Sequence, residues 1–126
     1  MKKIKVSEAS GLVLDWLVAK ALGLGYRNDE KYGPMCFRPQ THPGVVHWDS
    51  KPLPYSTDWS QGGPIIEREG IWVSDPSGDV LHPRQWGALH KGTMHDTRGP
   101  TPLIAAMRCF VASRLGDEVE VPEESL

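Results

Sequence analysis

The sequence predicts a small α+β domain with two main helices and a short, mainly antiparallel sheet. Two segments near the ends of the chain carry apolar residues at helical spacing. Short runs typical of β-strands lie beside and between them. Most of the 13 glycines and 11 prolines lie between residues 23 and 102, so the middle should be rich in loops and turns. A length of 126 residues fits a single domain over 1–126.

The amino-terminal part predicts a strand followed by a helix. Ile4 and Val6 alternate with lysines, which is typical of a short strand. Ser7 or Ser10 can cap the helix that we expect over 10–22, where leucine, valine and alanine recur at i, i+3, i+4 and i+7. This stripe is typical of core packing.

The segment 24–54 predicts one hairpin or a long loop. MCFR at 35–38 and GVVHW at 44–48 are short-strand candidates, and turn-forming residues surround them. Farther along, PIIERE at 64–69 predicts a helical turn, because Pro64 suits the first helical position.

The next segments predict a hairpin and a second loop. IWVS at 71–74 is a strand candidate, and VLH at 80–82 is its expected partner across the turn DPSGD. The segment 84–99 is predicted to be loop-like.

The carboxyl-terminal part contains the clearest helix signal. Thr101 is the expected N-cap, Pro102 the first helical residue, and Gly116 follows the last turn. EVEV at 118–121 predicts a final strand. The tail 117–126 holds five acidic residues and no basic one, which is typical of a solvated end.

Charge and composition exclude some functional classes. The net charge of −2 argues against a broad basic surface for nucleic acid, but a small anion needs only a few donors. Cys36 and Cys109 have no metal or redox spacing, and no cofactor motif is present. With no secretory or membrane-spanning segment in the sequence, we expect a cytoplasmic protein with reduced thiols.

The stretch YSTDWSQGGPII at 55–66 is the first candidate site. Its candidate ligand-binding residues are Tyr55, Ser56, Thr57, Asp58, Trp59, Gln61, Gly62 and Gly63. Glycines let backbone amides approach a phosphate, and aromatic rings stack on a base or sugar. Asp58 can accept a hydrogen bond from a ribose or base edge. A tight turn needs similar residues, and no known phosphate-loop motif is present, so both interpretations stay open.

The stretch RGPTP at 98–102 is the second candidate. Arg98 can pair with a negative charge, and Thr101 lies at a helix N-terminus, where an anion is favoured. Ordinary capping explains the same residues. If the two stretches meet in the fold, they predict one shared anion pocket.

Histidines and acids give weaker signals. Possible metal ligands are His42, His47 and Asp49 in one loop, and His90, His95 and Asp96 in another. No HExxH pattern supports them, so hydrogen-bonding or surface histidines are favoured. The candidates for general acid–base chemistry are Asp58, Glu67, Glu69 and His95. They can act only if they converge, and no nucleophile motif accompanies them, so catalysis is not favoured.

The sequence has five tryptophans. We expect Trp16 and Trp72 in the core. Trp48, Trp59 and Trp86 are expected in loops, where an indole often contacts a ligand or a partner protein.

Three blocks, 3–23, 55–71 and 99–122, resemble the NinX-like family of small proteins from tailed bacteriophages, a family without an assigned function. The likeness covers about half of the chain. The segments 24–54 and 72–98 do not share it and are expected to vary among members. The resemblance implies a phage protein in the cytoplasm of the infected bacterial host.

This source favours an accessory protein that acts on the host. The leading hypothesis is a non-enzymatic protein that binds and sequesters a small phosphorylated ligand, such as a nucleotide-derived signal of host defence. Closing the pocket between subunits would help retain the ligand, so a homo-oligomer is expected. The alternatives are a module that inhibits a host protein through exposed tryptophans and a small nucleotide hydrolase that uses Asp58, Glu67 or a histidine.

Overall fold

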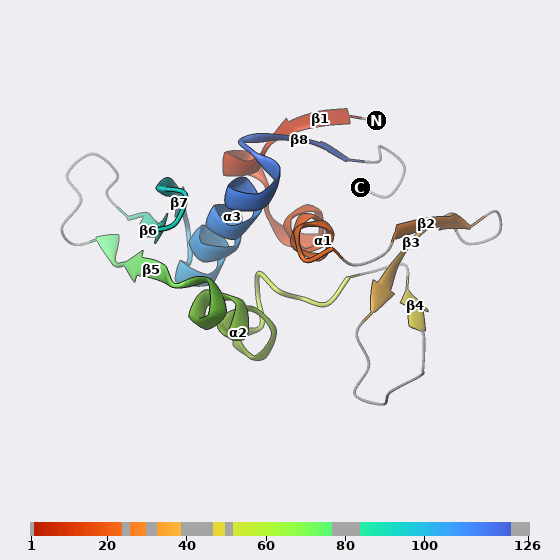
Figure 1. Ribbon diagram of the computed structural model, residues 1–126, viewed down its shortest axis with the longest axis horizontal. Helices are drawn as coiled ribbons and strands as arrows, with labels where there is room; N and C mark the ends of the chain where they lie inside the picture. Colours follow the sequence, from red (N-terminus) through yellow and green to blue (C-terminus); the bar gives the residue numbers. More distant parts are fainter. Residues whose placement is uncertain are drawn as a thin grey trace.

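The computed structural model describes residues 2–23, 26–29, 33–38, 47–49, 52–76 and 84–121 (Figure 1). Its helices are η1 (Val6–Glu8), α1 (Gly11–Ala21), α2 (Trp59–Glu69) and α3 (Pro102–Leu115). Its strands are β1 (Lys2–Lys5), β2 (Tyr26–Asp29), β3 (Gly33–Arg38), β4 (His47–Asp49), β5 (Ile71–Ser74), β6 (Trp86–His90), β7 (His95–Gly99) and β8 (Glu118–Val121). All strand pairs are antiparallel, which confirms the predicted α+β class.

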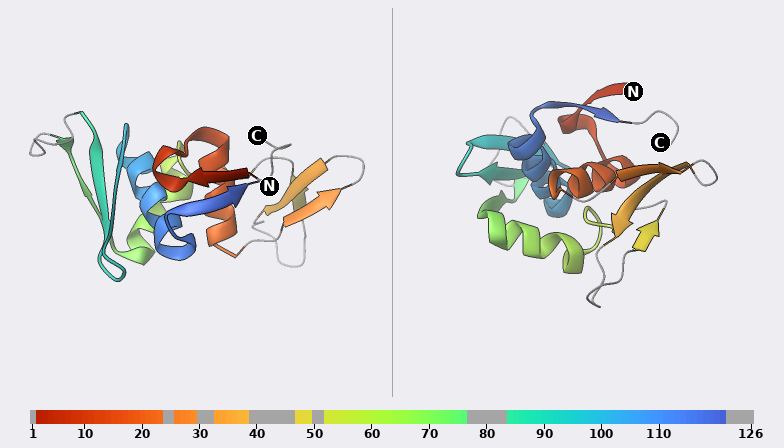
Figure 2. Two further views of the ribbon diagram at one scale, coloured as in Figure 1. Left: turned by 90° about the horizontal axis from the view of Figure 1, so that it is seen from above. Right: turned by 45° about the vertical axis from the view of Figure 1, so that its right-hand side comes forward.

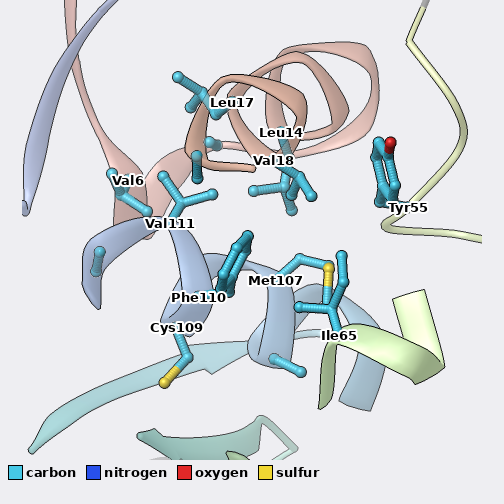
Figure 3. Packing of buried hydrophobic residues seen from close by; sticks show 14 of the residues in the cluster. Val6, Leu14, Leu17, Val18, Tyr55, Ile65, Met107, Cys109, Phe110 and Val111 are labelled. Carbon is cyan, nitrogen blue, oxygen red and sulfur yellow. The ribbon is translucent and has the colours of Figure 1, made fainter. Parts of the chain in front are cut away.

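Helix α3 is the centre of the fold. Helices α1 and α2 and the sheet β5–β6–β7 pack around it (Figures 1 and 2). Met107, Phe110 and Val111 are fully buried, and they face α1 in the core (Figure 3). Alanines and Cys109 on the other sides of α3 are buried too, because the sheet covers the face that α1 leaves open.

The ends of α3 follow the sequence signals. The Thr101 Oγ1 accepts a hydrogen bond from the Ile104 N–H at 3.1 Å, and Pro102 occupies the first turn. Gly116 ends the helix with a φ of 92°, which a residue with a Cβ rarely adopts. Helix α1 also lies where it was predicted, and Ser10 holds its N-cap position without a side-chain hydrogen bond.

The two ends of the chain pair with each other. Strands β1 and β8 form a two-stranded sheet in which Lys5 lies opposite Glu118. Both strands were predicted. The expectation of a solvated tail is wrong for 118–121, because alternation in EVEV turns Val119 and Val121 into the core. Residues 122–126 lie outside the described part of the chain.

The predicted loop at 84–99 is instead a hairpin of β6 and β7, and β6 is the partner of β5. The expected partner at 80–82 lies outside the described residues. One face of this sheet packs against α3 through small residues. An added Cβ on Gly99 would lie 2.7 Å from the Ala105 nitrogen. Because β6 and β7 contain many small and polar residues, their sequences lack the apolar alternation that would have predicted strands.

Trp72 is 59% exposed, so the prediction of a core residue is wrong. Successive strand residues point to opposite faces, and Ile71, which is 6% exposed, takes the inner face. Trp16 is 7% exposed and lies in the core as predicted.

The sheet β2–β3–β4 contains the predicted strand 35–38 within β3. The candidate 44–48 is represented by β4 from His47 onward, and residues 44–46 lie outside the described part. Strand β2 was not predicted. None of the helices in the described residues is long and apolar enough to cross a membrane.

Candidate functional site

The first turns of α2 and α3 border one shallow hollow of about 230 Å³, named here the α2–α3 hollow. Its lining residues are Ser56, Thr57, Trp59, Thr101, Pro102, Leu103 and Ile104. The two stretches singled out in the sequence therefore meet. Helix α2 lies beside the amino-terminal half of α3 (Figure 1).

Helix α2 begins at Trp59, five residues before the predicted start at Pro64. Asp58 is its N-cap, and its Oδ1 accepts hydrogen bonds from the Ser60 N–H at 2.9 Å and the Ser60 hydroxyl at 2.7 Å. These hydrogen bonds from Ser60 lower the pKa of Asp58. The carboxylate is therefore ionised at neutral pH and contributes a negative charge to the start of α2.

The first turn of α2 uses most of its own backbone donors. The N–H groups of Gln61 and Gly62 both donate to the Asp58 carbonyl at 3.0 Å, and Asp58 also caps Ser60. Gly62 and Gly63 are helical residues, so the expectation that their amides form a ligand-binding loop is wrong. Only the Trp59 N–H of this turn has no acceptor in the described part of the chain.

The first turn of α3 likewise has one backbone N–H group without an acceptor among the described residues. Thr101 Oγ1 accepts from the Ile104 N–H, and the Thr101 carbonyl accepts from the Ala105 N–H at 3.0 Å. Pro102 has no N–H. The Leu103 N–H is left without an acceptor among the described residues, and Leu103 lines the hollow.

Ser56 lies at the inner wall of the hollow. It is 1% exposed, and its hydroxyl makes no hydrogen bond of ordinary geometry with the described residues, although it is close enough to the Asp15 carboxylate to lower the pKa of that group. Its N–H donates to the buried Asp15 Oδ1 at 2.7 Å, which fixes the backbone at this point. A buried hydroxyl without a partner is costly, so it marks a place where a ligand atom would be stabilising.

Trp59 is the most exposed aromatic residue of the hollow, at 55%. Its ring offers a flat face for stacking beside the exposed Thr57. Tyr55 does not share this role, because it is 4% exposed and its ring lies near Leu14 and Val18 of α1 (Figure 3). The expectation that the Tyr55 ring stacks on a ligand is therefore wrong.

Arg98 does not line the hollow. Its guanidinium hydrogen-bonds the Asp96 carboxylate and lies 3.2 Å from the Thr97 carbonyl, on strand β7. Gln61 is partly buried and also lies outside the lining. Of the predicted set, the structure brings together Ser56, Thr57, Trp59 and Thr101, with the Asp58 carboxylate between Thr57 and Trp59 in the chain.

Gly62 explains why α2 and α3 can approach so closely. An added Cβ would collide with the Tyr55 carbonyl oxygen and would lie 2.6 Å from Leu103 Cδ1. The glycine thus sets the spacing between the helices that border the hollow. Neither Leu103 nor Asp15 was found from the sequence. The available signal was an acidic residue within the apolar run LVLDWLVAKAL.

The predicted acid–base set does not converge. Asp58 and Glu69 lie at opposite ends of α2, roughly 16 Å apart at about 1.5 Å per residue. Glu69 instead accepts from the Arg114 Nη2 at 2.9 Å and lies 3.3 Å from the His90 Nε2. Burial raises the pKa of Glu69, but the hydrogen bonds from His90 and Arg114 outweigh it, so its pKa is lowered.

The histidines of the second predicted metal group make local hydrogen bonds. His95 Nδ1 lies 2.7 Å from Thr93 Oγ1, which in turn lies 3.1 Å from His90 Nδ1. No three potential metal ligands cluster within the described ranges. His42 lies outside those ranges, as do the side chains of His47 and Asp49.

The comparisons agree with the resemblance of the three sequence blocks. The family model described as Bacteriophage P22, NinX matches residues 5–114 of this chain. No curated protein sequence matches it. Since the family match extends over most of the sequence, the chain belongs to the bacteriophage P22 NinX family.

Proposed function

We propose that this protein is a phage accessory protein that binds and sequesters a small phosphorylated ligand in the cytoplasm of the infected host. The ligand class is a nucleotide-derived signal, and the site is the α2–α3 hollow. The observation that carries the proposal is the buried Ser56 hydroxyl, which makes no hydrogen bond of ordinary geometry with the described residues and lies beside two helix N-termini.

Each donor of the hollow has a role in this proposal. The Ser56 hydroxyl and the Trp59 and Leu103 N–H groups donate to phosphate oxygens, and the positive ends of the two helix dipoles favour the negative charge. Trp59 stacks on the base. The ionised Asp58 repels phosphate, so it accepts from a ribose hydroxyl or a base N–H.

The size of the hollow limits what it can enclose. Pockets for small molecules typically measure about 300–1,000 Å³, whereas the hollow measures about 230 Å³. It would hold the phosphate and part of the sugar, with the base on the exposed face of Trp59. A second copy that covers Trp59 would close the site, which is the reason for proposing a homo-oligomer.

A second function, inhibition of a host protein, is supported by the exposed Trp59 indole next to Pro102 and Ile104. Such an indole beside apolar side chains is typical of an anchor at a protein interface. Hydrolysis of the ligand has less support, because Glu69 and His90 contact each other at the end of α2 that is remote from Asp58 and the hollow.

Ser56→Ala separates folding from ligand binding. Removing an unsatisfied buried hydroxyl should leave the free energy of unfolding of the free protein unchanged or raise it by up to about 1 kcal/mol. The same change should weaken the ligand about tenfold, because one hydrogen bond to a charged group contributes about 1.5 kcal/mol. Thermal unfolding with mono-, di- and cyclic nucleotides and ADP-ribose, followed by mass analysis of each compound, measures both effects.

Trp59→Ala should also reduce the thermal shift, whereas Trp72→Ala should not, although both indoles are similarly exposed in the free protein. A ligand at a hundredfold excess over its Kd stabilises by about 2.7 kcal/mol. Recovery of the intact compound supports sequestration, and conversion would indicate an enzyme. Absence of any shift across the panel would contradict the proposal and favour a host-protein partner.

A further inference from the structure

A second cavity, larger than the α2–α3 hollow, is formed where β7, η1 and the start of β8 meet α3. It has a volume of about 430 Å³ and is named here the Arg108 cavity. Strand β7 lies on one side of α3 with η1 and β8 close by (Figures 1 and 2). Lys5 and Ser7 line one wall, and Arg108 and Ala112 of α3 line another.

Arg108 is held in a fixed orientation within this cavity. Its Nε donates to the Ala9 carbonyl at 2.8 Å, and its Nη1 donates to the Arg98 carbonyl at 2.8 Å. The guanidinium thus joins the end of η1 to the outer edge of β7. Its Nη2 makes no hydrogen bond with the described residues, although a guanidinium can donate from all three nitrogens.

The charge of Arg108 is not compensated in the usual way. The side chain is partly buried, and burial lowers its pKa. No carboxylate lies within ion-pair distance of it in the described part of the chain, and its two partners are neutral carbonyls. Partly buried cations are normally paired with an anion, because removing a charge from water is costly. An oxyanion facing Nη2 would supply the missing charge.

The carboxylates that also line the cavity limit the charge of the anion that can bind there. Asp96 is bonded to Arg98, and Glu118 lies 3.8 Å from Lys3, so each already has a cation. Asp117 adds another negative charge to the lining. These groups repel a polyphosphate but tolerate an anion of one or two charges, which Lys5 and Arg108 can balance.

We propose that the Arg108 cavity binds a small oxyanion, a carboxylate or a single phosphate, through the open edge of the Arg108 guanidinium and with support from Lys5. A planar guanidinium matches both anions, because two parallel N–H groups can meet two oxygens. This site is separate from the α2–α3 hollow, and it stands whether or not the hollow binds a nucleotide.

The test is an NMR titration of the arginine Nε–Hε signals in the full chain. Inorganic phosphate and acetate are the two probes, and sodium chloride keeps the ionic strength constant. We expect the Arg108 signal to shift saturably with at least one probe, while the Arg114 signal stays nearly unchanged. Arg114 is the matched control, because it lies on the same helix and is already paired with Glu69. A linear drift of equal size at both arginines would overturn the proposal.

Two variants complete the test. Lys5→Gln alters an exposed residue and should weaken the anion about fivefold, as expected for loss of one nearby charge. Arg108→Lys keeps the charge but loses the planar fork, and it should weaken binding at least about tenfold. Since Arg108→Lys can also disturb the fold, the wild-type titration and Lys5→Gln decide the result. Unchanged affinity in Lys5→Gln would contradict the proposed role of Lys5.

Discussion

Gly62→Ala is expected to lower the free energy of unfolding by about 2 kcal/mol, although alanine is normally the better helix former by about 1 kcal/mol. The added methyl would collide with the Tyr55 carbonyl oxygen and lie 2.6 Å from Leu103 Cδ1. Such overpacking costs about 1–3 kcal/mol, occasionally more, and a backbone carbonyl cannot move aside as a side chain can. Urea denaturation monitored by tryptophan fluorescence measures the change.

Gly63→Ala is the matched control in the same helix. The nearest atom to its added Cβ is Trp59 Cε3 at 3.9 Å, an ordinary contact. This variant should gain about 0.5–1 kcal/mol from helix propensity and reduced freedom of the unfolded chain. Equal stabilisation by both substitutions would contradict the close packing of α2 against α3. Because the collision lies beside the α2–α3 hollow, Gly62→Ala should also weaken any ligand bound there.

The elements that could be predicted from the sequence are those whose signals are local. Thr101, Pro102 and Gly116 define the ends of α3 through capping and backbone preference, which do not depend on distant residues. Strand β8 alternates charged and apolar residues, and the structure keeps that alternation. In β1 the apolar Ile4 lies opposite Val119 of β8. For the same reason α1 was located to within about one residue.

The elements that the sequence did not predict depend on contacts between distant segments. Gly62, Gly63 and Pro64 read as a turn, yet Gly62 is required because α2 must approach Leu103 of α3. Strand β7 is rich in polar residues. Its Thr97 hydroxyl donates to the Ala105 carbonyl at 2.8 Å, so a polar residue serves on the face toward α3. No local pattern reveals these requirements.

The candidate site was predicted in part for the same reasons. The start of α3 was recognised from its cap, whereas α2 begins five residues before the predicted helical turn at Pro64. The structure brings both helix starts to one hollow. Arg98 was grouped with Thr101 because of its nearness in sequence, but its side chain pairs with Asp96 instead. The anchoring of Ser56 by Asp15 could not be foreseen, since 41 residues separate them.

Asp15→Ala is expected to lower the free energy of unfolding at neutral pH by about 1–3 kcal/mol, because the buried Ser56 N–H would lose its acceptor. Asp15 is 7% exposed, and its Oδ1 accepts that N–H at 2.7 Å. Asp15→Asn is the control, since an amide oxygen can accept the same hydrogen bond without a charge. The two variants therefore separate the hydrogen bond from the charge.

The pH dependence gives this pair of variants a second readout. Burial raises the pKa of Asp15, and it outweighs the interactions with the Ser56 hydroxyl and the Ser56 N–H, which both lower it. A carboxyl whose pKa is raised in the folded state stabilises the fold fully below its unfolded pKa of about 3.9, and this contribution is lost as the pH rises through the folded value. In the wild type this contribution of Asp15 to the free energy of unfolding should decline from about pH 4 upward. In Asp15→Asn the contribution should be absent at every pH.

At pH 7 Asp15→Asn should therefore be at least as stable as the wild type, while Asp15→Ala is less stable. Urea denaturation of the three proteins between about pH 4 and 8 distinguishes these outcomes. If asparagine were as damaging as alanine at neutral pH, the negative charge itself would be required. The charge of Asp15 would then stabilise the fold at this position. The hydrogen bond from the Ser56 N–H alone would not explain the role of Asp15.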